Sequence, residues 1–398
     1  MLFELIITLV LGILAGTITG IIPGIHINLV ATILLSVIAI INLSQNQAIV
    51  FIISMAITHT FFDFIPSIFL GAPDSDTALS ILPGHEFLLK GSGHHAVLLT
   101  LTGSILSIIL LFAITPLVTF LIPRIYPFIQ QMLGFFLIWT SIFLITRKKK
   151  AILITTIIFA LAGFLGIAAL NSNISEPLLP LLSGLFGAST LVNSIQTNSI
   201  IPKQVISKFK ITKKELIKPA IATTIVSPIA ALFPGVGSSQ AAIIGSQVTG
   251  KLNENQFLIL LGSINTLIMA SSFLILFLIQ KTRTGAANAL LQIIDLDQTN
   301  IKIIFATILV TTLFVIPITI NTSKIFAKNI HKINYSKISI AILLFLTTII
   351  LFFSGVIGFL IFIVSTILGI TCLKVGVSKS ILMSSLLIPT TLWYLPFF

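Results

Sequence analysis

The sequence is short of charge, of acidic residues and of cysteine. Only 8% of its 398 residues are charged, ten are acidic, and the single cysteine is Cys372. Soluble domains carry about 25% charged residues, so a water-soluble globule and a disordered chain are both excluded. One cysteine excludes an intrachain disulfide framework and a thiolate metal site. The first residues also lack the basic n-region of a signal peptide, so we expect the first helix to stay in the mature protein.

Long apolar runs make up most of the chain. Hydrophobic residues account for 56% of the sequence, and the mean hydropathy is +1.17. A helix needs about 20 apolar residues to cross about 30 Å of hydrocarbon, so this length accommodates about ten to twelve transmembrane or re-entrant helices. The sequence therefore predicts an all-α polytopic membrane protein in contact with membrane lipids.

Proline, glycine and charge divide the apolar runs into segments. We expect His94–Ile122 to be separate from Ile125–Thr146, and Ile338–Phe353 from Val356–Leu373. The polar stretches 71–93 and 281–300 are expected to be loops between spans.

Positive charge is concentrated in short clusters between the apolar runs. A net charge of +12 could indicate a nucleic-acid partner, but clusters spaced by membrane spans indicate topology instead, and we expect no nucleic-acid binding. If the Arg147–Lys150 cluster is cytoplasmic, all but four of the 22 Lys and Arg residues fall on that side. The four exceptions are Arg124, Lys281, Arg283 and Lys302. The pattern predicts a multi-pass protein of the cell membrane with both termini extracytoplasmic.

The two halves of the sequence share spaced matches in the same order. Ile22-Pro23-Gly24-Ile25 matches Phe233-Pro234-Gly235-Val236, and Leu43-x-x-Asn46-Gln47 matches Leu252-x-x-Asn255-Gln256, at offsets of 211 and 209. We predict a first membrane repeat over 1–200, a basic cytoplasmic linker over 201–218 and a second repeat over 219–398. The charge pattern gives the repeats opposite orientations, and inverted repeats with broken helices are typical of secondary transporters. A duplication without a transport role is the alternative.

A Pro-Gly pair interrupts an apolar segment in each repeat. We expect Leu2–Ile41 and Pro219–Thr249 to form re-entrant or broken-helix hairpins with their tips near the membrane midplane. The free N–H groups and the dipole at a helix start favour an anion. The predicted substrate-binding residues are Pro23, Gly24, His26, Asn28, Pro234, Gly235, Gly237, Ser238 and Ser239. The alternative is that the Pro-Gly pairs are simple kinks or loop ends.

Ionisable side chains are rare within the apolar runs. Asp63 lies inside one, with His59 one helical turn earlier on the same face. Such residues usually serve a pathway, so we predict that His59 and Asp63 couple proton or ion movement, with Asp74 and Asp76 along the cytoplasmic route. The alternatives are a satisfied pair at the end of a span and a solvated loop.

No motif for metal or nucleophilic chemistry is complete. His85-Glu86 lacks the second histidine of H-E-x-x-H, and there is no G-x-S-x-G. We therefore expect no bound metal, no cofactor apart from a coupling H⁺ or Na⁺, and no enzymatic activity.

Several segments share motifs with one family. Residues 16–24 read G-T-I-T-G-I-I-P-G, and Gly71–Pro73 with Pro83–Val97, Gly184–Leu191 and Pro234–Gly237 follow in order. These segments resemble motifs of TctA, the large permease subunit of tripartite tricarboxylate transporters, although Ile25–Asn28 replaces a glycine-rich stretch and the chain is shorter than typical members. The resemblance implies a carboxylate permease that works with a small membrane subunit and an extracytoplasmic binding protein. A second copy of the chain, forming a homodimer, is a further candidate partner.

Together these features predict a secondary active transporter, a symporter that moves a small organic anion with H⁺ or Na⁺. The anion is a carboxylate by resemblance. Pro234–Ser239 also resembles the Pro-Gly-x-Ser-Gly motifs of bacterial polyprenyl-phosphate translocases, so a lipid-carrier translocase is one alternative. A non-transporting membrane scaffold is the alternative of another class.

Overall fold

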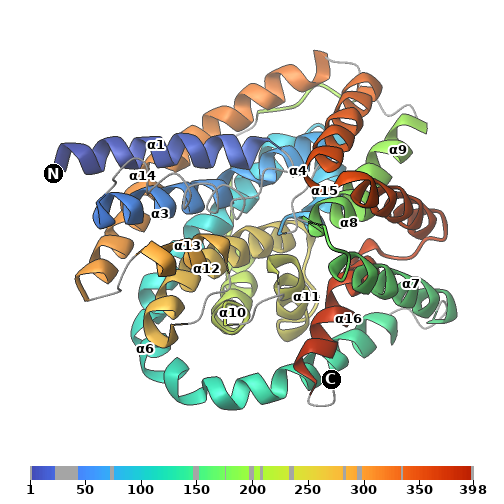
Figure 1. Ribbon diagram of the computed structural model, residues 1–398. Coiled ribbons are helices and arrows are strands. Elements are labelled where there is room, and N and C mark those ends of the chain that lie inside the picture. Colours follow the sequence, from blue (N-terminus) through green and yellow to red (C-terminus); the bar gives the residue numbers. More distant parts are fainter. Residues whose placement is uncertain are drawn as a thin grey trace.

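The computed structural model describes residues 2–22, 44–71, 76–146, 152–174, 176–196, 201–206, 209–232, 237–280, 284–293, 298–332 and 335–395. Throughout these residues the regular elements are helices, and there is no strand. In chain order they are α1 (Leu2–Ile21), α3 (Gln45–Phe62), α4 (Phe64–Leu70), η1 (Ala78–Ser80), α5 (Ile81–Leu89), α6 (Gly93–Thr146), α7 (Ile152–Leu170), α8 (Leu178–Leu182), η3 (Ser183–Ala188), α9 (Ser189–Gln196), α10 (Lys213–Ala230), α11 (Ser238–Val248), α12 (Glu254–Ile279), α13 (Gly285–Ile293), α14 (Gln298–Asn329), η4 (Ile330–Lys332), α15 (Tyr335–Lys374), η5 (Lys379–Met383) and α16 (Ser384–Tyr394). Figure 1 shows two groups of helices, one around α1, α3, α6 and α10–α14 and the other around α7–α9, α15 and α16.

Seven helical segments of the described chain are long and apolar enough to cross a membrane. They begin at Leu2, Gln45, Gly93, Ile152, Glu254, Asn300 and Ser339, and three shorter apolar helices accompany them. Two of the seven, Gln45–Leu70 and Glu254–Ile279, are almost wholly buried by other helices, whereas the others expose one side. The prediction of an all-α polytopic membrane protein is confirmed, with these two segments at its centre.

The same helix pairing occurs in both halves of the chain. Helices α1 and α3 run parallel, and Thr19 Oγ1 lies 3.1 Å from His59 Nδ1, a sequence separation of 40. Helices α10 and α12 also run parallel, with Thr223 bonded to Ser263 at 2.5 Å and again a separation of 40. Two helices joined by equal lengths of chain and paired in equal register are the structural counterpart of the sequence repeat.

The two halves are inverted relative to each other. Helices α3 and α12 cross where Thr266 Oγ1 donates to Thr60 Oγ1 at 3.2 Å and Asn265 Nδ2 donates to Asp63 Oδ2 at 2.7 Å. The pairing advances along α3 while it retreats along α12, as in helices of opposite direction, and Figure 1 shows the two helices running in opposite senses. Because each is parallel to its own partner, the whole pairs point in opposite directions, as predicted.

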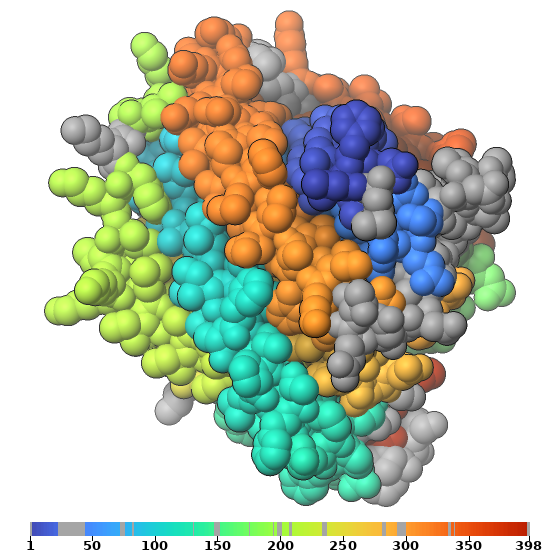
Figure 2. Space-filling model, turned by 90° about the vertical axis from the view of Figure 1, so that its left-hand side faces the viewer, coloured from blue at the N-terminus to red at the C-terminus, as the bar shows by residue number. Residues whose placement is uncertain are grey.

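Long helices from each half of the chain pack against the other half. Helix α6 packs along α12, and α14 packs along α3; Figure 2 shows α14 lying between α6 and α1 on one face. Glycine makes the first contact possible, because a Cβ at Gly262 would overlap the Thr100 carbonyl and a Cβ at Gly103 would overlap the Ile259 carbonyl. Small residues bring membrane helices into backbone contact in this way. In the second group, α16 packs on α7 and α15 on η3 in a similar exchange.

The repeated Asn-Gln motif is a pair of helix caps. Ser44 accepts a hydrogen bond from the Gln47 backbone at the start of α3, and Asn253 accepts one from Gln256 at the start of α12; each glutamine side chain bonds back to the cap residue. These capping boxes satisfy donors that a helix start leaves free. The sequence match at an offset of 209 therefore marks two equivalent helix starts.

Loss of either cap is expected to destabilise the fold by a similar amount. We expect Ser44→Ala and Asn253→Ala each to lower the free energy of unfolding by ~1 kcal/mol, the usual cost of an N-cap. Unfolding of the detergent-solubilised protein by SDS titration measures the change. The exposed neighbour Gln45 serves as control, because Gln45→Ala leaves the capping bonds intact; equal effects of Gln45→Ala and Ser44→Ala would contradict the prediction.

Three expected boundaries differ in the structure, and one is confirmed. Helix α6 continues through Pro123 and Pro127, and its apolar segments, Gly93–Ile129 and Gln131–Thr146, divide only at residue 130. In α15 the backbone leaves the helical conformation at Gly355, with φ 62 and ψ −162, so the predicted separation of the segments on either side of it is confirmed as a kink between two helices. Backbone without helical bonds is costly in hydrocarbon, so a bent helix is retained at the prolines of α6. The polar stretches 71–93 and 281–300 are not simple loops, because they include α5 and α13.

Of the two helices that precede the Pro-Gly segments, α10 ends part-way along its partner, whereas α1 ends level with the end of α3. Gly20, near the end of α1, lies against Phe62 and Asp63. Helix α10 ends at Ala230, and the separation of 40 places this end beside residue 270, before α12 ends at Ile279. Helix α1 has 20 residues, about 30 Å, and is itself long enough for a span, whereas α10 begins with the basic residues Lys213 and Lys214. Of these two helices, α1 is therefore the longer.

Several basic segments that are distant in sequence meet on one face. The Gly91 carbonyl accepts a hydrogen bond from Val205 beside Lys203, Lys218 Nζ donates to the Lys251 carbonyl, and Lys90 pairs with Glu86. The side chains of the segment around residues 200–220 project from this face in Figure 2. The division into 1–200, 201–218 and 219–398 stays a prediction, as does the side of the membrane that this face occupies.

Candidate substrate site

The start of α11 holds a carboxylate. Ser238 is the first residue of this helix, and its backbone N–H donates to Asp76 Oδ1 at 2.8 Å. Ser239 Oγ donates to the Asp76 backbone carbonyl at 2.9 Å, and the Gly237 N–H bonds to Gln240 Oε1. Asp76 comes from the first half of the chain and α11 from the second. A helix N-terminus stabilises negative charge through its free N–H groups and dipole, and here the protein supplies that charge itself.

The local sequence explains why α11 begins at this position. Gly237 takes the extended N-cap conformation, with φ −69 and ψ 168, and its N–H donates to the Gln240 side chain. Ser238, Ser239 and Gln240 are all buried. The helix therefore presents its N-terminus inside the protein, within reach of a side chain from the other repeat.

A polar crossing between α3 and α12 lies in the centre of the molecule. Asp63 is 3% exposed and its carboxylate accepts the Asn265 amide, while the neighbouring Thr60 and Thr266 hydroxyls form a second bond. A carboxylate at this depth is costly unless polar partners surround it. The crossing supplies such partners from both repeats, so it also joins the two inverted halves.

His59 and Asp63 have different partners in the structure. The Asp63 N–H donates to the His59 carbonyl at 3.0 Å within one helical turn, as expected from their spacing. The His59 ring, however, lies against Thr19 of α1, while the Asp63 carboxylate bonds to α12. Their role in coupling stays a prediction, and the geometry connects them to the two different helices that flank α3.

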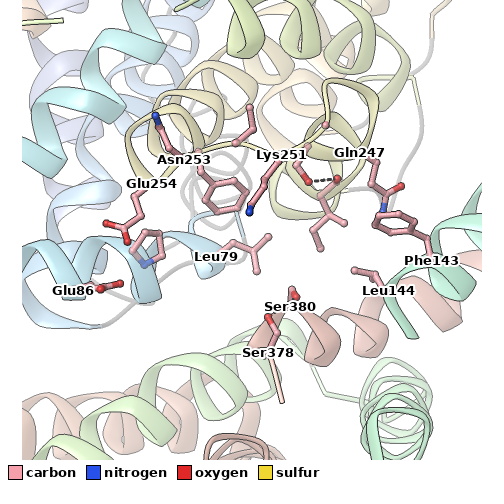
Figure 3. A pocket seen from close by; sticks show the side chains of 16 residues that line it. Leu79, Glu86, Phe143, Leu144, Gln247, Lys251, Asn253, Glu254, Ser378 and Ser380 are labelled. Atoms are coloured by element: carbon pink, nitrogen blue, oxygen red, sulfur yellow. Dashed lines mark hydrogen bonds between the residues drawn. The ribbon is translucent and has the colours of Figure 1, made fainter. Parts of the chain in front are cut away.

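An open cavity of about 780 Å³ lies beside α11 on the basic face. Figure 3 shows Lys251 and Asn253 on one side of it and Ser378 and Ser380 on the other. Gln247 lines it from the C-terminal half of α11, and Leu79 lines it three residues after Asp76. The cavity therefore lies beside the C-terminal half of the helix whose N-terminus holds Asp76, and Ser238 and Asp76 are not part of its lining.

The rim of this cavity is charged. Lys90 Nζ lies 2.9 Å from Glu86 Oε1 and 3.8 Å from Glu254 Oε2, and all three side chains are about half exposed. The bond from Glu86 raises the pKa of Lys90, so the lysine stays charged. An exposed pair of this kind contributes little stability, and its charges face the route by which a solute would enter.

The predicted site residues fall into three groups. Gly237, Ser238 and Ser239 lie at the start of α11, where Asp76 joins them. His59 and Asp63 lie at the end of α3. Pro23, Gly24, His26, Asn28, Asp74, Pro234 and Gly235 lie outside the described residues.

Sequence reasoning missed Asn265 and Thr266, whereas Gln240 was among the residues expected to follow the second Pro-Gly break. Asn265 stands in the middle of an apolar run of 26 residues, and an amide at that position was a usable signal of a buried polar contact. Across the described residues, no group of three or more His, Cys, Asp or Glu is placed to hold a metal ion.

Inverted helix pairs that enclose a helix N-terminus define a polytopic membrane protein built from two opposed halves. The model of the tripartite tricarboxylate transporter TctA family matches residues 6–384. The chain belongs to the TctA family, a family of transport proteins, as the sequence resemblance predicted.

A relative of nearly the same length is similar to this chain over almost the whole sequence. The uncharacterized protein MJ1079 of Methanocaldococcus jannaschii is 29% identical over 397 residues, which cover 97% of this chain and 98% of that protein. No solved structure matches the chain. Family membership implies partner subunits of the tripartite kind and a multi-pass place in a membrane.

Proposed function

We propose that the chain is a secondary active transporter for a small organic anion, a carboxylate, driven by H⁺ or Na⁺. The observation that supports it is the Asp76 carboxylate held by the Ser238 N–H at the start of α11. The N–H group that donates to an internal carboxylate has the chemistry to donate to the carboxylate of a substrate. In this proposal a solute from the basic face enters through the open cavity beside the C-terminal half of α11 and passes along the helix to its N-terminus.

Exchange between Asp76 and a substrate gives a simple working cycle. When the side chain of Asp76 leaves Ser238, the N–H and the helix dipole are available to the incoming anion. When the anion leaves, Asp76 returns and neutralises the site. The polar crossing at Asp63 and Asn265 joins the two repeats, so movement of one repeat against the other passes through it.

The partners in this proposal follow from the family. An extracytoplasmic binding protein delivers the anion to the outer face, and a small membrane subunit covers apolar helix faces such as that of α1. The chain resides in the cell membrane with the basic face in the cytoplasm and both termini outside. A homodimer is a further arrangement that the exposed apolar faces allow.

The test is a binding measurement on the purified protein. We expect citrate or another di- or tricarboxylate to raise the melting temperature in a saturable way, at two pH values and with or without Na⁺. Ligand at 100 times its Kd stabilises by about 2.7 kcal/mol. Uptake into proteoliposomes then checks transport of the ligand that binds.

One substitution removes the proposed donor N–H together with the Ser238 hydroxyl. Ser238→Pro deletes the N–H at the first position of α11, where proline is well tolerated, and the extended Gly237 suits a following proline. We expect at least a tenfold loss of carboxylate affinity. Ser246→Ala, at the other end of the same helix, is the matched control. Unchanged affinity in Ser238→Pro would contradict the proposed site.

A lipid-phosphate translocase has one observation in its favour. An apolar cavity of about 610 Å³ lies where the end of α1 meets α14 and α15, lined by residues such as Ile21, Phe326 and Phe345. Such a groove suits a lipid chain. Stabilisation by polyprenyl phosphate and not by free carboxylates would favour this function. A scaffold without transport predicts that a cysteine at Ser239, in a Cys372→Ala background, has the same labelling whichever ligand is present.

A further inference from the structure

Lys379 is a lysine enclosed by the protein. It begins η5, between α15 and α16, and is only 2% exposed. Its Nζ donates to the Phe186 carbonyl at 3.0 Å, to Ser189 Oγ at 2.8 Å and to Thr190 Oγ1 at 2.6 Å. All three acceptors are neutral, and they come from the turn where η3 passes into α9. We call these three acceptors the Lys379 cage.

The oxygens of the cage are oriented to accept hydrogen bonds from an amine. Thr190 Oγ1 donates to the Phe186 carbonyl at 2.6 Å, and Ser189 Oγ donates to the Leu185 carbonyl at 2.7 Å. Because both hydroxyl protons are committed to the backbone, each oxygen presents lone pairs to Nζ. Element η3 is a π-helix, whose wider turn leaves carbonyls available to side chains, and such turns occur often at functional sites.

Among the described residues, no carboxylate lies within ion-pair distance of Lys379 Nζ. The titratable groups that act on it are His85 of α5 and Cys372 of α15. Helix α7 has none, α16 has only Tyr394, α15 adds the exposed Lys374, and α6 around Phe143 carries none. An enclosed cation without an anion is unstable unless it can lose its proton.

Burial is the main cause of the unusual acidity in this cluster. It lowers the pKa of Lys379 to about 7, outside the seven candidate spans. Burial, and then the charge of Lys379, lowers the pKa of His85 to about 4, so this histidine is neutral at physiological pH. One proton can therefore enter and leave the cluster near neutral pH, at Lys379.

The lysine is also linked to the cavity wall. Ser378 and Ser380, on either side of it, line the cavity opposite Lys251. A change in the charge of Lys379 alters its attachment to η3 and therefore the position of η5. The wall that faces α11 is thus connected to a single titratable amine.

We infer that Lys379 is a proton-binding site, enclosed by Phe186, Ser189 and Thr190, whose protonation supplies the coupling H⁺ and positions the η5 wall of the cavity. The step adds one proton to the Nζ lone pair and later removes it, with no other bond changed. The coupling role rests on the proposed transport function, while the proton site itself does not.

The proton site is tested without transport. Below about pH 7 the folded and unfolded chains both carry a protonated lysine, and between about 7 and 10.5 only the unfolded chain does. Stability contributed by this group therefore rises with pH across that window, with the folding equilibrium shifting about tenfold per pH unit. We expect the melting temperature of the wild type to rise with pH relative to Lys379→Met. Lys374→Met, which removes an exposed lysine of α15, should leave the wild-type profile unchanged.

Coupling is tested in proteoliposomes with a carboxylate that the wild type accumulates. Lys379→Met should keep solute counterflow and lose at least tenfold of the accumulation driven by a pH gradient. If Lys379→Met does not fold, Thr190→Val removes one acceptor of the cage and should move the pH midpoint of stability. Parallel melting profiles of wild type, Lys379→Met and Thr190→Val would overturn the proton site. Full pH-driven accumulation in Lys379→Met would overturn the coupling role, and a wild type that transports nothing would overturn the proposed function alone.

Discussion

Gly262→Ala is expected to prevent α6 and α12 from packing, although alanine is normally the better helix former. A methyl group at this position would overlap the Thr100 backbone carbonyl, which cannot move without displacing α6. Overpacking typically costs 1–3 kcal/mol and sometimes more, and we expect roughly 3 kcal/mol here because the obstacle is backbone. Loss of monodisperse protein and a large fall in melting temperature are the measured result.

A matched glycine distinguishes packing from helix propensity. A Cβ at Gly245 would lie 3.3 Å from Ala222 Cβ and from Ile264 Cδ1, contacts that can relax, so Gly245→Ala should be tolerated. Gly103→Ala meets the Ile259 carbonyl and should behave like Gly262→Ala. Since both substitutions separate the same two helices, the double variant should lose less than the sum of the single losses. Strict additivity would show that the two glycines do not share one interface.

Asp76→Ala is expected to tighten carboxylate binding while it abolishes net transport. In the wild type a substrate must displace the Asp76 carboxylate from the Ser238 N–H. Without that carboxylate the helix N-terminus is free, and we expect the Kd for the substrate to fall at least tenfold. The empty site would then carry an unneutralised helix dipole, so the return step without substrate should become slow.

Asp76→Asn provides the matched control, because the amide oxygen can still accept the Ser238 N–H but carries no charge. Its affinity should lie between those of wild type and Asp76→Ala. Titration calorimetry and uptake in proteoliposomes measure the two effects separately. If Asp76 were only a helix cap, Asp76→Ala would cost ~1 kcal/mol of stability and leave the substrate Kd unchanged, which would remove the competition model.

The sequence predicted those parts of the fold that depend on local chemistry. The match between Leu43–Gln47 and Leu252–Gln256 identified two equivalent helix starts, because a capping box is encoded within four residues. The apolar runs predicted the spans for the same reason. The boundary predicted near Pro123 falls at residue 130 in the structure, because proline disturbs only one turn and the surrounding hydrocarbon favours a continuous helix over exposed backbone.

The site was predicted only in part. Ser238 and Ser239 could be predicted from the sequence because a Pro-Gly pair precedes a helix start. Their contact with Asp76 spans 162 residues and depends on the placement of one repeat against the other. Lys379 was missed for the same reason, since its acceptors lie about 190 residues earlier and two of them are common hydroxyl residues.

The exchange of helices between the halves has a consequence for biosynthesis. Helix α3 enters the membrane early, yet α14, which covers it, is made near the end of synthesis. The polar residues Thr60 and Asp63 of α3 also wait for Thr266 and Asn265 of α12, so until both helices follow, this surface contacts lipid or a helper protein. The two halves therefore cannot complete their folding one after the other. We expect a membrane insertase or chaperone that shelters polar helices to act during translation of residues 63–298.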